Sequence, residues 1–232
     1  MSEFRFKRFS VRQDGSALKV GTDAVLLGAA MTVLPSDRRM LDIGAGTGVI
    51  ALMAAQRSAP ECLVEAVEID GPSVSDASLN FSSSPWSERL RVRQIALQDF
   101  APEAAYDLIF SNPPYYDGSL VNPDAREAAA RHCGSLTLNE ICAFAAGNLR
   151  PRGRLALILP SEEETRLMRT AASFGLFPFR IVRIKTTEKK APKRLIAEFS
   201  RSREEVSETT LTLQEGSGRS AQYSSLTEEF YL

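Results

Sequence analysis

The sequence contains few of the residues that build metal sites and disulfide frameworks. Its 232 residues include three cysteines and one histidine. Cys62, Cys133 and Cys142 form no C-x-x-C pair, which argues against a zinc site or a disulfide framework and fits a reducing cytoplasm. The single histidine, His132, excludes His-rich metal sites and mechanisms that need two histidines. We therefore expect a cytoplasmic protein without a bound metal.

Long apolar runs are also missing. None approaches the roughly 20 residues that a bilayer span requires, and the start, MSEFRFKRFSVRQDG, lacks the apolar region of a secretory signal. The composition, 44% hydrophobic and 25% charged, suits one globular domain with small additions. The net charge of −1 hides a local bias, because residues 180–203 carry nine Lys/Arg against two Glu, and residues 204–232 carry six Glu against one Arg.

Strand-like and helix-like segments alternate through most of the chain. Strands are expected at 38–43, 62–70, 89–97, 106–110 and 154–160. Helices are expected at 47–58, 71–84, 136–153 and 161–175. This order predicts an α/β fold with a mostly parallel sheet and helices on both faces. Two further strands, at 176–186 and 194–201, have no helix between them and predict an antiparallel edge feature.

Smaller elements are expected at both ends. Residues 4–11 (FRFKRFSV) read as one strand with its aromatic side chains on one face, and residues 17–20 as the returning strand of a hairpin. Residues 21–34 predict a helix that Thr22 or Asp23 caps and Pro35 ends. TTLTLQ (209–214) predicts a strand and SSLTEEFYL (224–232) a short helix. We expect residues 1–37 to pack as an extension on a core domain of residues 38–232.

A glycine-rich turn, LDIGAGTG, follows the first parallel strand. Glycine at alternate positions permits positive φ and close approach of a ligand, and the following helix N-terminus favours an anion. Asp42 beside the turn suits an ammonium group, so the turn predicts an amino-acid moiety such as the methionine end of S-adenosylmethionine. Glu68, at the end of the next strand, can accept both ribose hydroxyls. For Asp70 we favour a helix cap.

The stretch SNPPYY, residues 111–116, follows the fourth strand. If the first and fourth strands are neighbours, it lies with the glycine turn at the carboxyl edge of the sheet. The Asn112 side-chain oxygen and the Pro113 carbonyl can hold a planar amino group, and Pro113 and Pro114 stiffen the turn. Tyr115 can stack on a planar base. Tyr116 is assigned to packing.

The segments that carry a family resemblance are LDIGAGTGVIALMAAQR, AVEID, SPWSERL, SNPPYY, FKRF…LKVGTD, KRLIAEF and the ending FYL. Over nearly its full length, the sequence resembles the bacterial tRNA(Val) adenine-37 N6-methyltransferases. These are S-adenosylmethionine-dependent enzymes with a Rossmann-like fold, a seven-stranded sheet and one antiparallel strand. The resemblance implies methylation of an adenine N6 in tRNA. NPPY alone also occurs in DNA, ribosomal RNA and protein-glutamine methyltransferases.

The resemblance also implies site residues. Asn112, Pro113, Pro114 and Tyr115 would hold the adenine. Cofactor residues would be Asp42, Gly44, Ala45, Gly46, Glu68, Ile69, Leu97 and Asn112. The helix start at Thr22 and Asp23 would close over the methionine end, or would simply cap the helix. Ala96 stands where such enzymes usually have an acidic residue, so a backbone group near Leu97, or Asp99, would contact the cofactor adenine.

A basic segment, RIKTTEKKAPKRL (183–195), joins the last two strands of the sheet and is expected at its carboxyl edge. Phosphate contacts are predicted from Lys185, Lys189, Lys190, Lys193 and Arg194, and from Arg126 and Arg131 in residues 117–132. The alternative interpretation of the basic segment is the tip of a hairpin whose charged side chains are only solvated. For His132 we favour local support, and for FRFKRF an amphipathic strand whose phenylalanines lie partly in the core.

The predicted function is therefore tRNA adenine N6-methylation by a monomer or weak dimer. The alternatives are methylation of ribosomal RNA or of a protein glutamine, and a non-catalytic S-adenosylmethionine-binding scaffold. Glutamine enzymes usually carry a helical N-terminal domain, whereas only about 37 residues precede the first parallel strand here. A DNA enzyme would usually need a large target-recognition region. Intact Asn112, prolines and Tyr115 argue against a scaffold.

Overall fold

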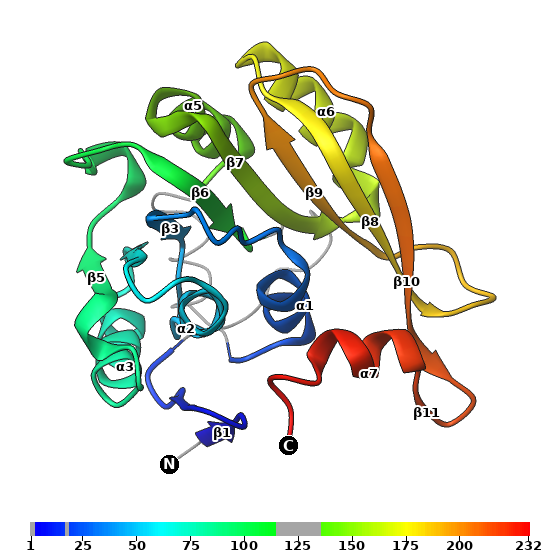
Figure 1. The fold of residues 1–232 in the computed structure, drawn as a ribbon, viewed down its shortest axis with the longest axis horizontal. Coiled ribbons are helices and arrows are strands. Elements are labelled where there is room, and N and C mark those ends of the chain that lie inside the picture. Colours follow the sequence, from blue (N-terminus) through cyan, green and yellow to red (C-terminus); the bar gives the residue numbers. More distant parts are fainter. Residues whose placement is uncertain (1–2, 17–18, 115–135) are drawn as a thin grey trace, which may run out of the picture.

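The computed structural model describes residues 3–16, 19–114 and 136–232. These residues form a nine-stranded sheet in the order β11-β10-β8-β9-β7-β6-β3-β4-β5 (Figure 1). The strands are β3 Arg39–Ile43, β4 Leu63–Glu68, β5 Leu90–Gln94, β6 Tyr106–Ser111, β7 Leu149–Pro160, β8 Phe177–Thr187, β9 Arg194–Ser200, β10 Ser207–Glu215 and β11 Gly218–Arg219. β9 is antiparallel to both of its neighbours, and β11 is antiparallel to β10. The α/β prediction is confirmed. β10 corresponds to the strand expected at 209–214, and with β11 it enlarges the seven-stranded sheet that the resemblance implies.

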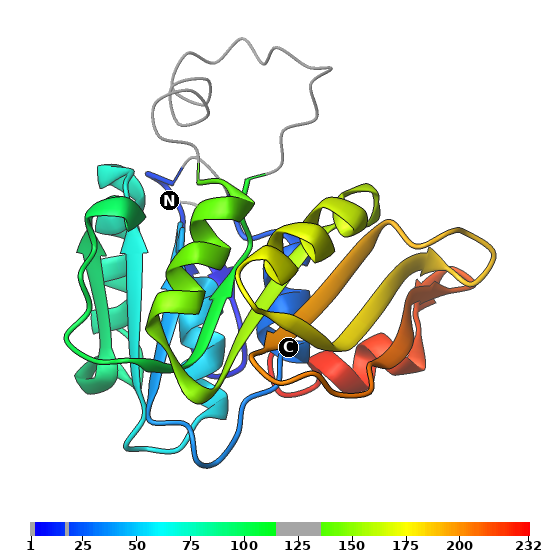
Figure 2. The ribbon, with the colours of Figure 1, turned by 90° about the horizontal axis from the view of Figure 1, so that it is seen from above.

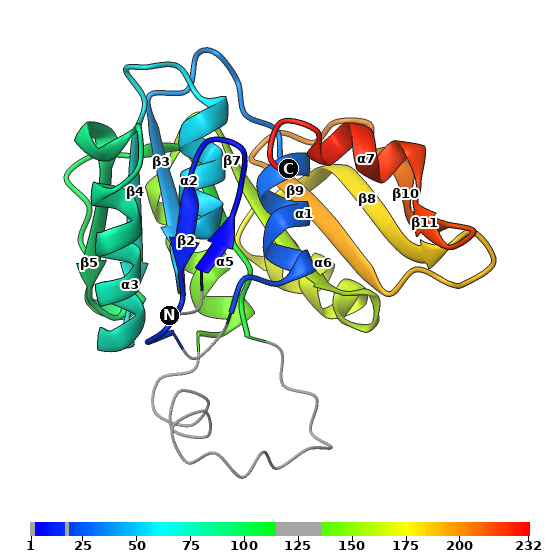
Figure 3. The same ribbon diagram turned by 90° about the horizontal axis from the view of Figure 1, so that it is seen from below.

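Helices cover both faces of the sheet (Figures 2 and 3). One face carries α5 (Leu138–Asn148) and α6 (Glu164–Ser173), and the other carries α1 (Thr22–Ala30), α2 (Val49–Arg57), α3 (Gly71–Ser82) and α7 (Ala221–Thr227). Short 3-10 turns are η1 Ser87–Arg89, η2 Leu97–Asp99 and η3 Ser161–Glu163. Because successive strand residues point to opposite faces, Leu155 and Leu157 of β7 enter one core and Ala156 and Ile158 the other.

The N-terminal hairpin differs from the prediction. β1 (Glu3–Arg5) pairs with β2 (Ser10–Arg12), so both strands come from the segment expected to be one strand. In a single strand Phe9 would face away from Phe6, because their positions differ by an odd number. The turn is closed by a hydrogen bond from Phe6 N–H to the Phe9 carbonyl at 2.9 Å. It allows the two rings to stack with 4.5 Å between their centroids, and both side chains are buried.

Several helix predictions are wrong in their ends. The helix expected at 224–232 is α7, which begins and ends earlier, at Ala221–Thr227. α1 begins after Gly21, without a side-chain cap, and it ends at Ala30 rather than at residue 34. Beyond it, the Thr32 backbone N–H donates to buried Glu198 at 2.9 Å, which draws the chain out of helical geometry. α5 ends at Asn148, and the predicted Pro-Gly stop lies inside β7. Asp70, in contrast, caps α3 as expected by accepting from Ser73 N–H at 3.0 Å.

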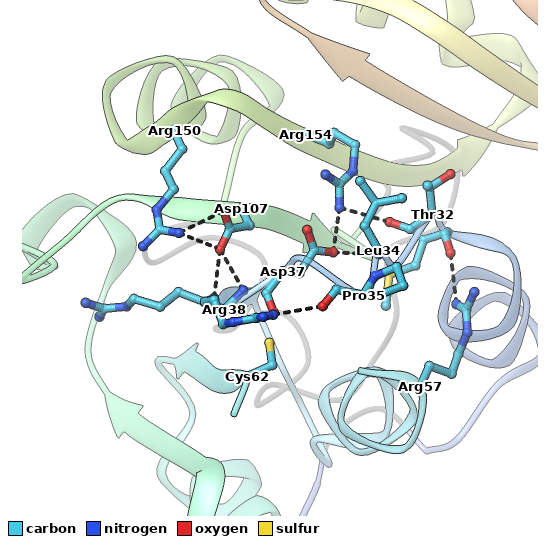
Figure 4. Close-up of polar contacts among 12 residues, drawn as sticks. Thr32, Leu34, Pro35, Asp37, Arg38, Arg57, Cys62, Asp107, Arg150 and Arg154 are labelled. Carbon is cyan, nitrogen blue, oxygen red and sulfur yellow. Dashed lines mark hydrogen bonds and ion pairs between the residues drawn. The ribbon is translucent and has the colours of Figure 1, made fainter. Parts of the chain in front are cut away.

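A polar network fastens the amino ends of the central strands (Figure 4). Asp107 accepts a hydrogen bond from the Arg38 backbone N–H at 2.8 Å and forms an ion pair with Arg150. Asp37 and Arg154 form a buried ion pair with 2.6 Å between Oδ2 and Nη2. This edge is opposite the carboxyl ends of the strands, so we assign the network to folding. In the described part of the chain, no helix has the length and apolar character needed to cross a membrane.

Candidate functional site

The glycine turn between β3 and α2 has the backbone that the sequence predicts. Gly44, Gly46 and Gly48 all have positive φ, at 71°, 53° and 78°, where other residues are strained. A Cβ on Gly46 would meet no atom within 4 Å, whereas a Cβ on Gly48 would lie 2.5 Å from the Phe81 ring. Gly48 is therefore required by packing, and Gly46 lies on an open side of the turn that a ligand can approach.

Asp42 is completely buried beside this turn. Its Oδ2 accepts a hydrogen bond from Ala51 N–H at 3.1 Å, while Oδ1 has no hydrogen-bond partner among the described residues. Burial raises the pKa of the Asp42 carboxyl to about 8, and the charge of Glu68 adds to this rise. A buried oxygen without a partner is costly, so a cationic group at this position would be stabilising. This feature fits the ammonium of an amino-acid moiety.

Glu68 is held by the backbone. Its Oε2 accepts from Gly46 N–H at 2.9 Å, and its Oε1 accepts from Ile69 and Asp70 N–H at 2.8 and 2.9 Å. A carboxylate offers about four acceptor positions. To accept hydrogen bonds from two ribose hydroxyls, Glu68 must therefore give up at least one of its three backbone hydrogen bonds. The bond from Gly46 N–H links Glu68 directly to the glycine turn. The sequence predicted a ribose contact for Glu68, which stays a prediction, and gave no sign of these backbone donors.

The remaining predicted cofactor residues follow β4 and β5. Ile69 exposes 48% of its surface, unusual for an apolar side chain directly after a buried strand. Leu97 is buried and begins the 3-10 turn η2, whose Asp99 is exposed. Ile95 N–H donates to the Glu68 carbonyl at 3.0 Å, which holds the two strand ends together. η2 thus contains both predicted contacts to the cofactor adenine, the backbone near Leu97 and the Asp99 carboxylate.

The SNPP sequence lies beside the glycine turn. β3 and β6 pair in parallel with Ile43 opposite Ser111, so the first and fourth strands are neighbours, as the shared site required. The buried Ser111 hydroxyl donates to the Ile43 carbonyl at 2.7 Å and joins the two strand ends. Asn112 is half-buried, Pro113 is buried and Pro114 is exposed. Outside the described residues lie Tyr115, Tyr116, Arg126, Arg131 and His132.

The basic segment reaches the same edge of the sheet. Arg194 lies opposite Pro160, the last residue of β7, and its Nε donates to Asp23 Oδ2 at 2.8 Å. Lys193 is exposed, and its carbonyl accepts from Ser161 N–H at 3.2 Å. Lys185 is half-buried, and Lys189, Lys190 and Thr22 are exposed.

The charge of the basic segment is partly neutralised, which the sequence count did not reveal. Arg183 pairs with Glu164 and Glu208, and Arg194 pairs with Asp23. No ion pair involves Lys185, Lys189, Lys190 or Lys193 within the described ranges 3–16, 19–114 and 136–232. The four lysines are therefore the cations of this segment that remain for a partner.

Comparison with known proteins gives the family. A sequence model of the methyltransferase small domain matches residues 16–175. The tRNA1(Val) (adenine(37)-N6)-methyltransferase of Tolumonas auensis is 43% identical over 231 residues, which cover 99% of this chain and 96% of the relative. The protein of the same name from Flavobacterium johnsoniae is 42% identical over 234 residues, which cover 99% of both chains. The chain belongs to the tRNA1(Val) (adenine(37)-N6)-methyltransferase family.

Solved structures agree on the fold. A protein described as a predicted O-methyltransferase from Agrobacterium tumefaciens superposes with a TM-score of 0.71 at 17% identity, covering 90% of this chain and 96% of that one. A TehB-like SAM-dependent methyltransferase from Corynebacterium glutamicum gives 0.51 at 16% identity, covering 78% and 88%. Membership in the tRNA1(Val) (adenine(37)-N6)-methyltransferase family makes the chain a methyltransferase and confirms the resemblance seen in its sequence. The roles of single residues stay predictions.

Proposed function

We propose that the protein transfers a methyl group from S-adenosylmethionine to the exocyclic N6 of adenine 37 in tRNA1(Val). The observation that carries this proposal is the position of two elements. The glycine turn and Asn112-Pro113-Pro114 follow neighbouring parallel strands whose ends are joined by Ser111 and Ile43. Ligands of open α/β sheets bind at the carboxyl ends of the strands. The names of relatives that match nearly the whole chain supply the substrate.

The cofactor half of the site suits the methyl donor. When bound, S-adenosylmethionine supplies an electrophilic methyl group on a sulfonium. We assign the Asp42 oxygen without a partner to the ammonium group, the backbone at Gly44, Ala45 and Gly46 to the carboxylate, and Glu68 to the ribose. Further contacts are assigned to Thr22, Asp23, Ile69, Leu97 and Asn112.

The acceptor half holds the adenine amino group. The lone pair of such a nitrogen is delocalised into the ring, so the amino group is a poor nucleophile. The Asn112 side-chain oxygen and the Pro113 carbonyl accept its two N–H bonds and favour the lone pair turned toward the methyl group. Pro113 and Pro114 keep the acceptors in place before the substrate binds. Tyr115 stacks on the ring, and the product nitrogen loses its proton to water.

The tRNA backbone is contacted by cations around this site. We assign phosphate contacts to the hairpin lysines Lys185, Lys189, Lys190 and Lys193, to Arg194, and to Arg126 and Arg131. RNA enzymes prefer unstacked loop bases because these can enter a pocket, and an anticodon loop presents such bases. We further propose a core domain of residues 38–232 with an extension of residues 1–37, a cytoplasmic location, a monomer or weak dimer, and no metal requirement.

The test uses purified protein, labelled S-adenosylmethionine and unmodified total tRNA, followed by nucleoside analysis. We expect label in N6-methyladenosine from tRNA. Label in ribosomal RNA or protein, offered in parallel, would favour the alternative acceptors. Cofactor binding without label in any acceptor would favour a non-catalytic scaffold.

A further inference from the structure

The side chain of Asn80, in α3, forms hydrogen bonds with two backbone segments that are distant in the sequence. It is 2% exposed. Its Oδ1 accepts from Arg12 N–H at 2.8 Å, and its Nδ2 donates to the carbonyls of Arg12 and Thr47, both at 2.9 Å. Arg12 ends β2 of the N-terminal extension, and Thr47 lies in the glycine turn. One amide therefore joins the extension to the turn.

We propose that Asn80 is a positioning residue that holds the glycine turn and the N-terminal extension together for cofactor binding. The proposal rests on the proposed function, because that function gives the glycine turn its cofactor. Asn80 itself lies behind the turn and contacts it through Thr47, which is 3% exposed.

The turn is fixed on two sides. On the sheet side, Gly44 and Ala45 N–H donate to the Val67 carbonyl at 2.9 and 3.2 Å. On the α3 side, Asn80 holds the Thr47 carbonyl, and the Phe81 ring fills the space where a Cβ of Gly48 would lie. Losing the Asn80 bond would leave the α3 side held by packing alone. Gly46 lies next to Thr47, so its N–H and open side would move with the turn.

The extension is fixed on the same face of α3. Asp76, one helical turn before Asn80, accepts from Gly15 N–H at 2.9 Å and from Ser16 N–H at 2.8 Å. Beyond this anchor, Val20 N–H donates to the Gln13 side chain at 2.8 Å. The chain then reaches the start of α1, where Thr22 and Asp23 were predicted to close over the cofactor. Asn80 and Asp76 of α3 thus hold the glycine turn and the segment that leads toward the start of α1.

An amide is required for this arrangement. Asparagine has one acceptor oxygen and two N–H donors, and all three functions are used here. Asn80→Asp preserves the shape and the acceptance from Arg12 N–H, but it loses both donations. The Thr47 carbonyl would then face a carboxylate instead of a donor, which costs more than the loss of one ordinary hydrogen bond.

The experiment measures S-adenosylhomocysteine binding by calorimetry, with no RNA present, for wild type, Asn80→Asp and Asn80→Ala. We expect Kd to rise about tenfold or more for both variants. With saturating cofactor and tRNA, kcat should stay within about twofold, because Asn80 contacts no reacting group. If Asn80 had a purely structural role, its loss would lower the unfolding temperature but would not raise KM for the cofactor while leaving kcat unchanged.

Arg12→Ala is the matched control, because Arg12 contacts Asn80 only through its main chain. It should bind S-adenosylhomocysteine like wild type. If a folded Asn80→Asp variant also binds like wild type, the proposal is wrong. Should neither Asn80 variant fold, hydrogen exchange on wild type decides: S-adenosylhomocysteine should slow exchange in residues 10–16 together with 44–52. Unchanged exchange in residues 10–16 would overturn the proposal.

The same data separate this proposal from the proposed function. Normal S-adenosylhomocysteine binding without methylated tRNA would contradict the acceptor and leave the Asn80 result valid. Failure of the wild type to bind S-adenosylhomocysteine would contradict the cofactor assignment itself.

Discussion

Asp23 and Arg194 are 171 residues apart in the sequence, and their side chains form an ion pair with 2.8 Å between Oδ2 and Nε. Asp23 lies in the first turn of α1, and Arg194 begins β9 beside the carboxyl end of β7. The family resemblance implies a cofactor role for Asp23, with a helix cap as the alternative, and the charge of the basic segment predicts a tRNA contact for Arg194. Their contact partly neutralises Arg194. If the proposed roles are right, RNA phosphates would compete with Asp23 for this guanidinium.

Removing Asp23 should strengthen the tRNA interaction. Asp23→Asn leaves Arg194 with its full charge, so one more cation can meet a phosphate. The slope of log K against log salt should then become steeper by about 0.7 to 0.9. The measurement is tRNA binding at several salt concentrations without cofactor. In an Arg194→Ala background, Asp23→Asn should not change this slope. If the slope of the Asp23→Asn variant equals that of wild type, Asp23 does not compete with RNA for Arg194. Both side chains are about one-third exposed, so stability should change by no more than about 1 kcal/mol.

Asn112→Ala should abolish most of the methyl transfer. Loss of one of the two acceptors for the amino group leaves the nitrogen free to rotate, and we expect kcat to fall about 100-fold or more. S-adenosylhomocysteine binding should change far less than kcat. Pro114→Ala, which alters an exposed residue of the same segment, should lose less activity. Full transfer by a folded Asn112→Ala variant would rule out the amino-group clamp.

Reversing the charge of the hairpin lysines should weaken tRNA binding. The double change Lys189→Glu and Lys190→Glu would remove two proposed phosphate contacts and add repulsion. The affinity for tRNA should therefore fall at least about tenfold, and its salt dependence should flatten. Arg152→Glu with Arg203→Glu is the control, because it changes net charge equally at the amino edge of the sheet. Equal losses in the two variants would mean that only net charge matters and that the hairpin is a solvated tip.

Cofactor affinity should depend on pH through Asp42. Its pKa is raised to about 8 by burial, so the carboxyl is mostly protonated at neutral pH. An ammonium ligand favours the ionised form, and binding must release the proton. Affinity for S-adenosylhomocysteine should therefore rise between about pH 6 and 7.5, by up to about tenfold per unit. The Asp42→Asn variant should bind S-adenosylhomocysteine more weakly, and its affinity should not rise with pH. If its affinity rises as that of wild type does, a group other than Asp42 releases the proton.

The same pKa makes a prediction for stability without ligand. Between about pH 4 and 8 the folded state binds a proton at Asp42 that the unfolded state has lost. The free energy of unfolding should therefore fall as pH rises through this range. The Asp42→Asn variant has no titrating group at this position, so wild type should lose stability relative to the variant as pH rises. Chemical denaturation of both proteins at about pH 5 and pH 8 tests the sign.

Local patterns were enough to predict the parallel core. The strand–helix alternation and the glycine turn follow from residues that are close in sequence. The adjacency of β3 and β6, which the sequence analysis could only assume, joins segments that are far apart in the chain. Asp42, near the end of β3, and Asn112, directly after β6, could be named as candidates from the motifs around them, and their roles stay predictions.

Contacts between distant segments could not be predicted. Thr32 leaves α1 because Glu198, 166 residues later, offers an acceptor. The turn at Phe6 and Phe9 depends on a core that both rings enter, and the pairing of β10 with β8 depends on sheet order. Glu68 was found as a carboxylate, but its three backbone donors exist only once the turn has folded.

The most direct test of the proposed function compares two transcripts of tRNA1(Val). One is the natural sequence, and the other carries guanine in place of adenine 37. With purified protein and labelled S-adenosylmethionine, only the natural transcript should yield N6-methyladenosine, at one methyl per tRNA. Equal labelling of both transcripts would contradict adenine 37 as the acceptor, and absence of N6-methyladenosine from both would contradict tRNA adenine methylation altogether.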